Sequence, residues 1–177
     1  MIAEELAWRG DTVVLVCRSR ERGEASRTGG YKIDFDDLML KKKYSAILAA
    51  SQSKLAQVMF TLELAQRLEG TGVTVNALHP GLVKSGITRE LPFFMRTMLN
   101  LVSTTPEKGA RTALYLATSP EVENVSGQYI GPKRKPLKLA AQANEPEARR
   151  RLWDLSVEMT ALRQAPLTNA ASPRLTI

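Results

Sequence analysis

The chain has 177 residues, of which 44% are hydrophobic and 24% charged, a composition that predicts one globular domain and excludes a disordered or fibrous protein. A single cysteine excludes an internal disulfide, and a single histidine leaves no Cys/His cluster for a structural zinc. No apolar run approaches the ~20 residues that span a bilayer, and the first residues carry carboxylates where a secretion signal would be apolar. A cytoplasmic location is therefore expected.

The net charge of +7 includes three basic clusters, at Lys41–Lys43, Lys133–Lys135 and Arg149–Arg151. Solvated surface explains clusters that are scattered and lack interleaved aromatic residues, so we expect no nucleic-acid partner. Peripheral contact with an intracellular membrane is a slightly stronger alternative, because Arg149–Arg151 fall on a predicted amphipathic helix. Neither is the leading hypothesis.

The N-terminal part predicts a helix followed by a buried strand. Residues 2–9 are helix formers, and Gly10 ends the run. No residue that could cap this helix precedes it, so we expect its lead-in to lie upstream of Met1. The run TVVLVC, residues 12–17, is continuous, apolar and rich in β-branched residues, which is typical of a strand covered on both faces of a parallel sheet. A charged loop with two adjacent glycines follows.

The middle of the chain predicts a long helix and a second strand. Residues 31–47 show no clear period, whereas residues 47–69 are expected to be helical and to end at Gly70. The segment 72–81, GVTVNALHPG, is expected to form a strand that stops at its Pro-Gly turn. Apolar residues recur at spacings of three, four or seven on one side of the helix, namely Leu48, Leu55, Met59, Leu62, Ala65 and Leu68.

Two further helices are expected at residues 88–102 and 106–118. The second has Thr105 as its N-cap, a proline in its first turn, and Glu107 near the positive end of the helix dipole.

The C-terminal part predicts a short third strand at residues 126–131, SGQYIG, and an amphipathic helix at residues 145–163. The tail, residues 165–177, is rich in Pro, Thr and Ala and is expected to be disordered. The apolar set of the last helix is Leu152, Leu155, Val157, Met159 and Leu162.

The segment SQSKLAQVMFTLELAQRLEGTGVTVNALHPG, residues 51–81, resembles the short-chain dehydrogenase/reductase family, in particular its retinol dehydrogenase-like branch. The resemblance runs with similar spacing from IDFDDL at Ile33 through SPEVENVSGQY to RRRLWDLSVEMTAL near the C-terminus, and residues 2–24 separately resemble the family's first helix and second strand. It implies an α/β chain that is a remnant of a Rossmann-type doubly wound parallel sheet, and an NAD(P)-dependent oxidoreductase acting on CH–OH groups.

The resemblance identifies Lys54 as the family's catalytic lysine. In the family a tyrosine four residues earlier lies on the same helical face and moves the proton, while the lysine lowers the pKa of that tyrosine and holds the nicotinamide ribose. Here that position is Ala50. Loss of the acid/base group lowers a rate by about 10²- to 10⁴-fold, and Tyr44, ten residues before Lys54, is not expected to replace it.

The resemblance also implies a set of cofactor contacts. Pro80 and Gly81 match the nicotinamide platform that follows a strand, and ligands of open α/β sheets bind outside the carboxyl ends of strands. The Val83 backbone would contact the carboxamide, and Ser85 stands where the family has a threonine. Arg18, after the first strand, would accept the 2′-phosphate of NADP(H), which favours this cofactor over NAD. A solvated charged loop remains the alternative for Arg18.

Several family motifs have no counterpart in the sequence. The glycine-rich loop TGxxxGxG is expected just before Met1, and the motif NNAG and the catalytic serine are skipped between Ser26 and Tyr31. The omitted middle corresponds to roughly 90 residues at ~30 per β-α unit. Of the family's strand order 3-2-1-4-5-6-7, strands 2, 6 and 7 remain. Strand 2 is therefore expected to lose both neighbours unless it pairs with another strand or chain.

These observations divide the chain into residues 1–26, a remnant of the cofactor-binding half, residues 27–164, the C-terminal half of the same Rossmann domain, and the tail. The first hypothesis is an NADP-dependent oxidoreductase lineage with lipophilic alcohol or carbonyl substrates, inactive in this form and without a metal. The alternative is a non-catalytic truncated isoform or pseudoenzyme that acts through protein–protein contacts, including a homo-oligomer.

Overall fold

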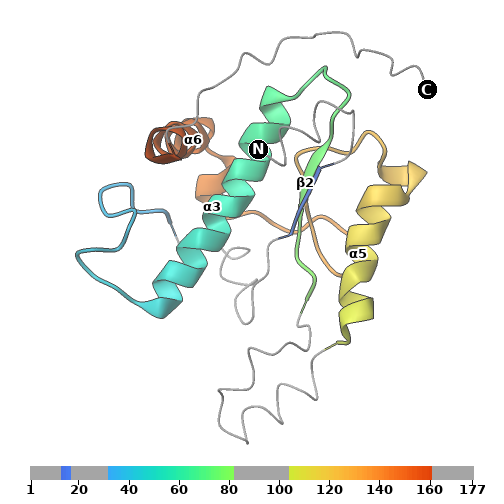
Figure 1. Cartoon of the computed structure of the whole chain (residues 1–177), viewed down its shortest axis with the longest axis horizontal. Coiled ribbons are helices and arrows are strands. Elements are labelled where there is room, and N and C mark those ends of the chain that lie inside the picture. The colour runs from blue at the N-terminus through green and yellow to red at the C-terminus, as the bar shows by residue number, and fades with distance from the viewer. Residues whose placement is uncertain (1–12, 17–31, 82–103, 161–177) are drawn as a thin grey trace, which may run out of the picture.

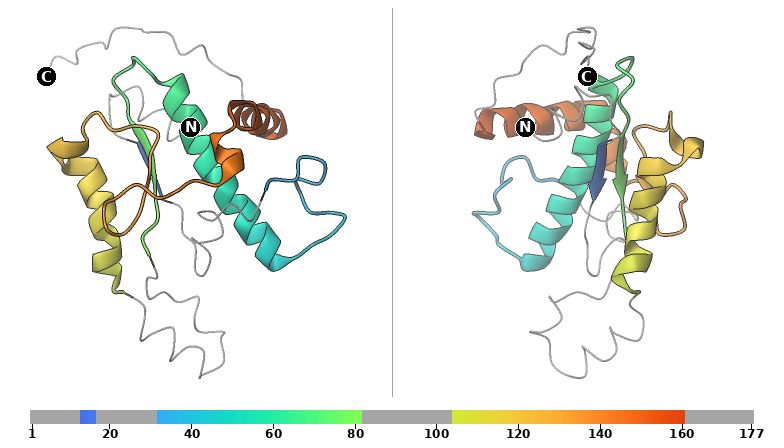
Figure 2. Two further views of the ribbon diagram at one scale, coloured as in Figure 1. Left: turned by 180° about the vertical axis from the view of Figure 1, so that it is seen from behind. Right: turned by 45° about the vertical axis from the view of Figure 1, so that its right-hand side comes forward.

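The computed structural model describes residues 32–81 and 104–160 with their side chains, and the backbone of residues 13–16. Three strands form one parallel sheet between two helices (Figure 1). Helix α3 (Ala46–Arg67) lies on one side of the sheet and α5 (Pro106–Thr118) on the other, as Figure 2 also shows. The described part therefore has the α/β architecture with a parallel sheet that the sequence predicts.

The strand order is β1-β2-β3, with all neighbours parallel. Strand β1 (Val13–Val16) pairs along its length with β2 (Val75–Leu78), whose other edge pairs with β3 (Tyr129–Ile130). Strand 2 of the family has thus lost its family neighbours and pairs on one edge with another strand, the exception that the sequence leaves open. Strand β1 takes the side of β2 opposite β3, because that side is open once the intervening strands are missing.

Helix α3 begins and ends within two residues of its predicted bounds. Its C-terminal end is set by Gly70 and Gly72, whose φ angles of 79° and 81° are in the left-handed region that favours glycine. The periodic pattern of apolar residues did not predict that polar side chains are also buried on this helix. Ser51 and Thr61 satisfy their hydroxyls by donating to the carbonyls of Ile47 and Gln57, four residues back.

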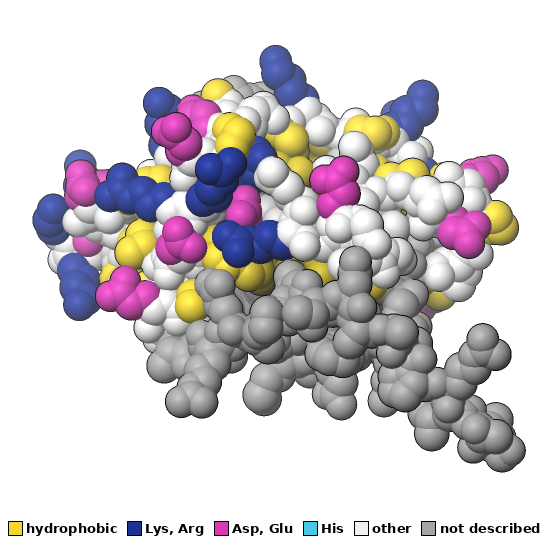
Figure 3. All heavy atoms as spheres, turned by 90° about the horizontal axis from the view of Figure 1, so that it is seen from above, with side chains coloured by type: hydrophobic (Ala, Val, Ile, Leu, Met, Phe, Trp, Pro, Cys, Tyr) yellow, Lys and Arg dark blue, Asp and Glu magenta, His cyan; other side chains and the backbone are white. Residues whose placement is uncertain are grey.

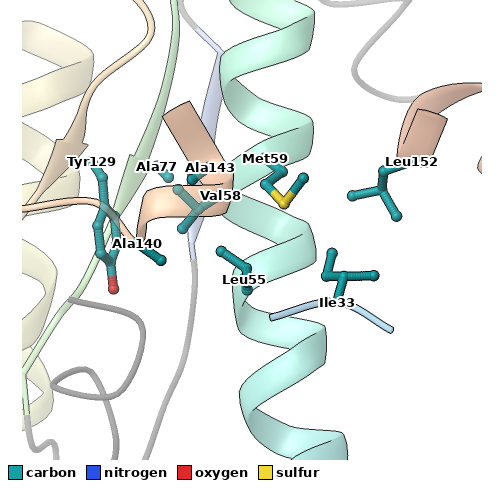
Figure 4. Packing of buried hydrophobic residues seen from close by; sticks show 9 residues of the cluster. All are labelled: Ile33, Leu55, Val58, Met59, Ala77, Tyr129, Ala140, Ala143 and Leu152. Carbon is teal, nitrogen blue, oxygen red and sulfur yellow. The ribbon is translucent and has the colours of Figure 1, made fainter. Parts of the chain in front are cut away.

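Most of the core lies between α3 and the sheet and extends to α6 (Pro146–Thr160). Figure 4 shows these side chains meeting from separate segments: the start of the described chain, α3, β2, β3, the short helix η3 (Ala141–Asn144) and α6. The buried members are Ile33, Leu55, Val58, Met59, Ala77, Tyr129, Ala140, Ala143 and Leu152. Burial of this kind gives roughly 25 cal/mol per Å² of apolar surface, so the core holds together elements from most of the described chain.

The segment before α3 is held by two glutamine side chains. Gln142 accepts from the Ile33 N–H at 2.6 Å and donates to the Ile33 carbonyl at 3.2 Å. Gln52 accepts from the Asp34 N–H at 3.3 Å and donates to the Leu38 carbonyl at 2.8 Å. These amides replace the backbone partners that an irregular segment lacks, which explains why it shows no periodic pattern.

The C-terminal elements follow the predictions with two differences. Helix α5 has the predicted bounds, and α6 ends at Thr160 within the described residues. Met159, predicted to be in the apolar set of α6, is 57% exposed, because α6 packs on α3 along its other side. The helix η2 (Pro120–Val122) was not predicted. The predicted helices 2–9 and 88–102 and the predicted disordered tail lie outside the described residues.

Candidate active site

Lys54 lies in the first half of α3, half-buried, with its Nζ donating to the side-chain oxygen of Gln57 at 3.2 Å. Position 50 is one helical turn before it, on the same face, and Ala50 is exposed to solvent. The structure therefore has a lysine and an open alanine where the family's proton-transfer pair would stand.

None of the tyrosines in the described part of the chain places its phenol at the position of Ala50. Tyr44 precedes α3 and is 74% exposed. Tyr115 donates its hydroxyl hydrogen to a glutamate 3.0 Å away on the α5 side of the sheet. Tyr129 is buried in the core. Tyr31 lies outside the described residues. The expectation that Tyr44 does not replace the catalytic tyrosine agrees with its position before the helix.

The Pro80–Gly81 turn follows directly after β2. Gly81 has a φ angle of 80°, and a Cβ placed there would lie 3.1 Å from Cγ of Pro132. Glycine is thus required both by the backbone conformation and by the close approach of the loop that follows β3. This contact joins the candidate nicotinamide platform to a segment some 50 residues later, which sequence reasoning did not find.

Lys54 and the Pro80–Gly81 turn are at the same end of the sheet. Leu68, at the end of α3, packs with Val73 and Val75 at the start of β2, whereas Leu55 packs in the cluster that contains Ala77, further along β2. Helix α3 and β2 therefore run in opposite directions, as Figure 1 shows. The first half of α3 accompanies the carboxyl end of β2, which is the end where open α/β sheets bind ligands.

The remaining predicted cofactor contacts, Arg18, Val83 and Ser85, lie outside the described residues. The register between β1 and β2 pairs Val16 with Leu78, so the carboxyl end of β1 is at the same edge as Pro80. The candidate site is thus defined by three residues, Lys54, Pro80 and Gly81, with Ala50 at the position of the missing acid.

A cavity of about 560 Å³ lies at the opposite end of the sheet. It is lined by the end of α3, the turn with Gly70 and Gly72, and residues such as Asn124, Ser126 and Arg149. Since these residues precede β2 and β3, the cavity is at the amino ends of the strands and does not adjoin Lys54 or Gly81. In the part of the chain that the structure describes, no cluster of three or more His, Cys, Asp or Glu side chains could hold a metal.

Arg149, in the basic cluster considered for membrane contact, makes contacts inside the fold. It donates to the Ala143 carbonyl at 3.0 Å and to the side-chain oxygen of Gln66 at 3.4 Å. Its Nε lies 4.0 Å from Oε2 of Glu63, a side chain only 5% exposed that also pairs with Arg67 at 2.8 Å. This network was not predicted from the sequence, because it joins side chains of α3 and α6, which are far apart in the chain.

Arg151 is also engaged, with its guanidinium 4.6 Å from the ring centre of Phe35 and 3.8 Å from Asp36. Figure 3 shows basic and acidic side chains interspersed over the face seen from the end of α3. Arg149 and Arg151 thus make contacts within the fold, whereas Arg150 is exposed, and the membrane alternative stays a prediction. None of the helices in residues 32–81 and 104–160 is long and apolar enough to cross a bilayer.

The described elements define a Rossmann-like α/β protein with a lysine-bearing helix and a Pro-Gly turn at one end of its parallel sheet. Human retinol dehydrogenase 14 is 46% identical over 136 residues, which cover 73% of this chain and 40% of that protein. Mouse retinol dehydrogenase 13 is 40% identical over 142 residues, 75% of this chain and 42% of that protein. No protein-family model matches the sequence.

A solved structure of an uncharacterised protein from Mycobacterium Paratuberculosis superposes with a TM-score of 0.57 at 27% identity, covering 85% of this chain and 51% of that one. Over the matched residues the chain is thus homologous to retinol dehydrogenases of the short-chain dehydrogenase/reductase family. It spans about two fifths of the length of the curated relatives it matches.

Proposed function

We propose that the chain descends from NADP(H)-dependent oxidoreductases acting on lipophilic alcohols or carbonyl compounds, retinoids among them, and that it does not itself catalyse hydride transfer. The observation that carries this proposal is Ala50, exposed on α3 one turn before Lys54. The bound cofactor would supply or accept the hydride. The substrate oxygen must gain or lose a proton in the same reaction, and a methyl side chain cannot provide it.

The residues present could hold the nicotinamide end of the cofactor, but they could not supply the proton transfer. Lys54 and the Pro80–Gly81 turn lie at one end of the sheet, where a cation and a backbone turn could hold the ribose and carboxamide of a nicotinamide. Lys54 is already paired with Gln57. With no acid at position 50, this arrangement would position a cofactor without moving a proton.

The pairing of β1 with β2 supports the inactive form. In the family order, strands 2 and 6 are separated by three strands, whereas here the corresponding strands are neighbours. Any residue carried at the end of β1 is then displaced relative to Lys54 by the width of three strands, about 14 Å at ~4.8 Å per strand. An adenosine-binding group such as Arg18 would no longer be at the family's distance from the nicotinamide platform.

The alternative function, a non-catalytic chain that binds a protein partner, is favoured by the surface at the start of α3. Tyr44 and Ile47 are 74% and 47% exposed, and Met39, in the turn before them, is also exposed. Apolar side chains that gather on one surface are typical of protein interaction sites. A homo-oligomer through this surface is one form of this alternative.

Titration of the purified chain into NADPH, followed by cofactor fluorescence, tests the proposal. We expect no saturable binding in the micromolar range and no turnover with a lipophilic alcohol or aldehyde. Saturable micromolar binding would show that the site still holds the cofactor and would contradict the loss of the wider site, whereas turnover would contradict the inactive form.

A second experiment distinguishes the loss of the acid/base group from the loss of the cofactor-binding site. Ala50→Tyr restores the phenol one turn before Lys54, and Ala117→Tyr adds the same phenol to an exposed position of α5 as a control. We expect both variants to remain without turnover, because a tyrosine alone does not restore cofactor binding. Turnover by Ala50→Tyr but not by Ala117→Tyr would mean that the acid was the sole defect, and the proposed loss of the wider site would be wrong.

A further inference from the structure

The basic cluster Lys133–Lys135 lies on the turn after β3, and backbone hydrogen bonds hold this turn. The Gly131 N–H donates to the Lys135 carbonyl at 2.9 Å, and the Arg134 N–H donates to the Gly131 carbonyl at 3.0 Å. Ile130 and Pro136 form an isolated antiparallel bridge that closes the base of the turn. The three basic residues are therefore held on a tight turn between two prolines.

The charges of this turn point to solvent. Lys133, Arg134 and Lys135 are all exposed, and no carboxylate in the described parts of the chain pairs with either lysine. Arg134 has a φ angle of 58° and places its guanidinium 4.7 Å from the ring centre of Tyr115. A non-glycine residue in the left-handed region is strained. The cation–π contact with Tyr115 stabilises this backbone, so the turn has a defined position on α5.

Two more cations lie beside the turn. The Thr112 hydroxyl, on α5, donates to the Pro132 carbonyl at 3.5 Å, and the loop after β3 runs beside α5 in Figure 2. Residues four apart on a helix are neighbours, so Lys108 is next to Thr112 and Arg111 is next to the Tyr115 that Arg134 covers. Both cations are exposed. We name the resulting surface the basic patch, made of Lys108, Arg111, Lys133, Arg134 and Lys135.

The basic patch borders an exposed apolar residue. Leu114, one turn beyond Arg111 on the solvent side of α5, is 61% exposed. Two acidic residues are close: Glu107, in the first turn of α5, and Glu121, which is bonded to Tyr115. Five cations against two carboxylates leave a net positive surface. The exposed leucine beside it is free to contact an apolar phase.

We propose that the basic patch docks the protein on an anionic lipid bilayer, with Leu114 entering the headgroup region. Near such a surface each Lys or Arg raises the partition coefficient by about fivefold. A cationic face with an adjacent apolar side chain is the usual pattern of interfacial binding. No exposed aromatic side chain of the described residues lies in the patch to stack on bases, which makes a single-stranded nucleic acid a poorer fit.

Docking would bring the carboxyl end of the sheet toward the bilayer, because Pro132 of the same loop packs on Gly81. In a lineage that acts on lipophilic substrates, as proposed above, this is the edge where such a substrate would arrive. Binding itself requires neither cofactor nor substrate. Its failure would therefore be distinguishable from failure of the proposed function.

The test is co-sedimentation of the 177-residue chain with phosphatidylcholine vesicles that contain or lack phosphatidylserine. We expect binding only to the anionic vesicles and its loss as NaCl is raised. The double variant Lys133→Glu/Lys135→Glu should weaken binding more than tenfold. The matched control is Lys41→Glu/Lys43→Glu, which makes the same change of charge at two exposed lysines of another cluster and should retain most of the binding.

Three outcomes would overturn the proposal: no binding to anionic vesicles, equal losses in the two double variants, or tighter binding to a single-stranded oligonucleotide than to vesicles. Leu114→Ser tests the apolar contact and should weaken binding to the anionic vesicles several-fold at low salt, where binding is measurable. An unchanged far-UV circular dichroism spectrum verifies that each variant is folded.

Discussion

At the scale of single residues, Asn76 shows how one buried side chain joins distant parts of the chain. It is 1% exposed, its amide donates to the Val125 carbonyl at 2.6 Å, and its side-chain oxygen accepts from the Gln128 N–H at 3.0 Å. An alternating strand pattern would place this residue outward, opposite Val75 and Ala77. It is buried because α5 covers the second face of the sheet, and its amide pairs the backbone groups just before β3.

We predict that Asn76→Ala lowers the free energy of unfolding by about 1–3 kcal/mol, because it leaves a partly buried carbonyl and a partly buried N–H without partners. Denaturant unfolding followed by circular dichroism measures the loss. Asn124→Ala, at an exposed position of the same region, is the matched control and should change stability by less than about 0.5 kcal/mol. Equal effects of the two substitutions would contradict the role of Asn76.

At the scale of elements, α5 was predicted with its correct bounds because its start is encoded locally. Thr105 accepts from the Lys108 N–H at 3.4 Å, with a proline in the first turn. The pKa of Glu107 is lowered by its own backbone N–H and by the Thr105 hydroxyl. By contrast, the glutamine contacts before α3 have no such local signal, since Gln142 bonds to Ile33, 109 residues away. The 3-10 helix η2 has local hydrogen bonds but is too short to show a periodic pattern.

Thr105→Ala should lower the free energy of unfolding by about 0.5–2 kcal/mol through loss of the cap, and should raise the pKa of Glu107 toward its ordinary value. Because the folded-state pKa of Glu107 lies below its unfolded value, its contribution to stability is present above the unfolded pKa. That contribution is lost as pH falls through the folded pKa. An NMR titration of the Glu107 carboxyl in both proteins measures the shift.

The control for this prediction is Thr118→Ala, at the other end of α5, where the hydroxyl donates to the Leu114 carbonyl at 2.8 Å. We expect it to change stability by less than about 0.5 kcal/mol and to leave the pKa of Glu107 as it is. If the two substitutions had the same effect on that pKa, the cap would not be its cause.

At the scale of the whole molecule, the decisive feature is the place of β1 in the sheet. The N–H groups of Ala77 and His79 donate to carbonyls at β3, so the alternate residues Asn76 and Leu78 direct their backbone groups to the other edge. Val14 is paired with Asn76 and Leu15 with Ala77. In a parallel ladder only one residue of each pair points its N–H and C=O at the other strand. Asn76 points at β1, so the backbone groups of Val14 point away from β2, whereas those of Leu15 point toward it. This geometry makes β1 testable residue by residue.

Leu15→Pro should therefore be more destabilising than Val14→Pro by about 1–3 kcal/mol, because it alone removes a ladder hydrogen bond and leaves a carbonyl of β2 unpaired. Both substitutions replace an apolar side chain by proline, so each serves as the other's control. Chemical denaturation of the two variants measures the difference. If they unfold alike, β1 is not paired with β2 in this register.

By itself, the sequence determined helices α3, α5 and α6, the three strand segments, the glycines that end α3 and the resemblance that singles out Lys54, Ala50 and the Pro80–Gly81 turn. Periodicity, caps and motifs are properties of neighbouring residues. Only the tertiary structure decided that β1 pairs with β2, that Arg149 is held inside while Lys133–Lys135 is presented to solvent, and that Pro132 closes on Gly81. Each of these features joins residues that are far apart in the chain. Which residues meet therefore depends on which strands and loops the folded chain contains.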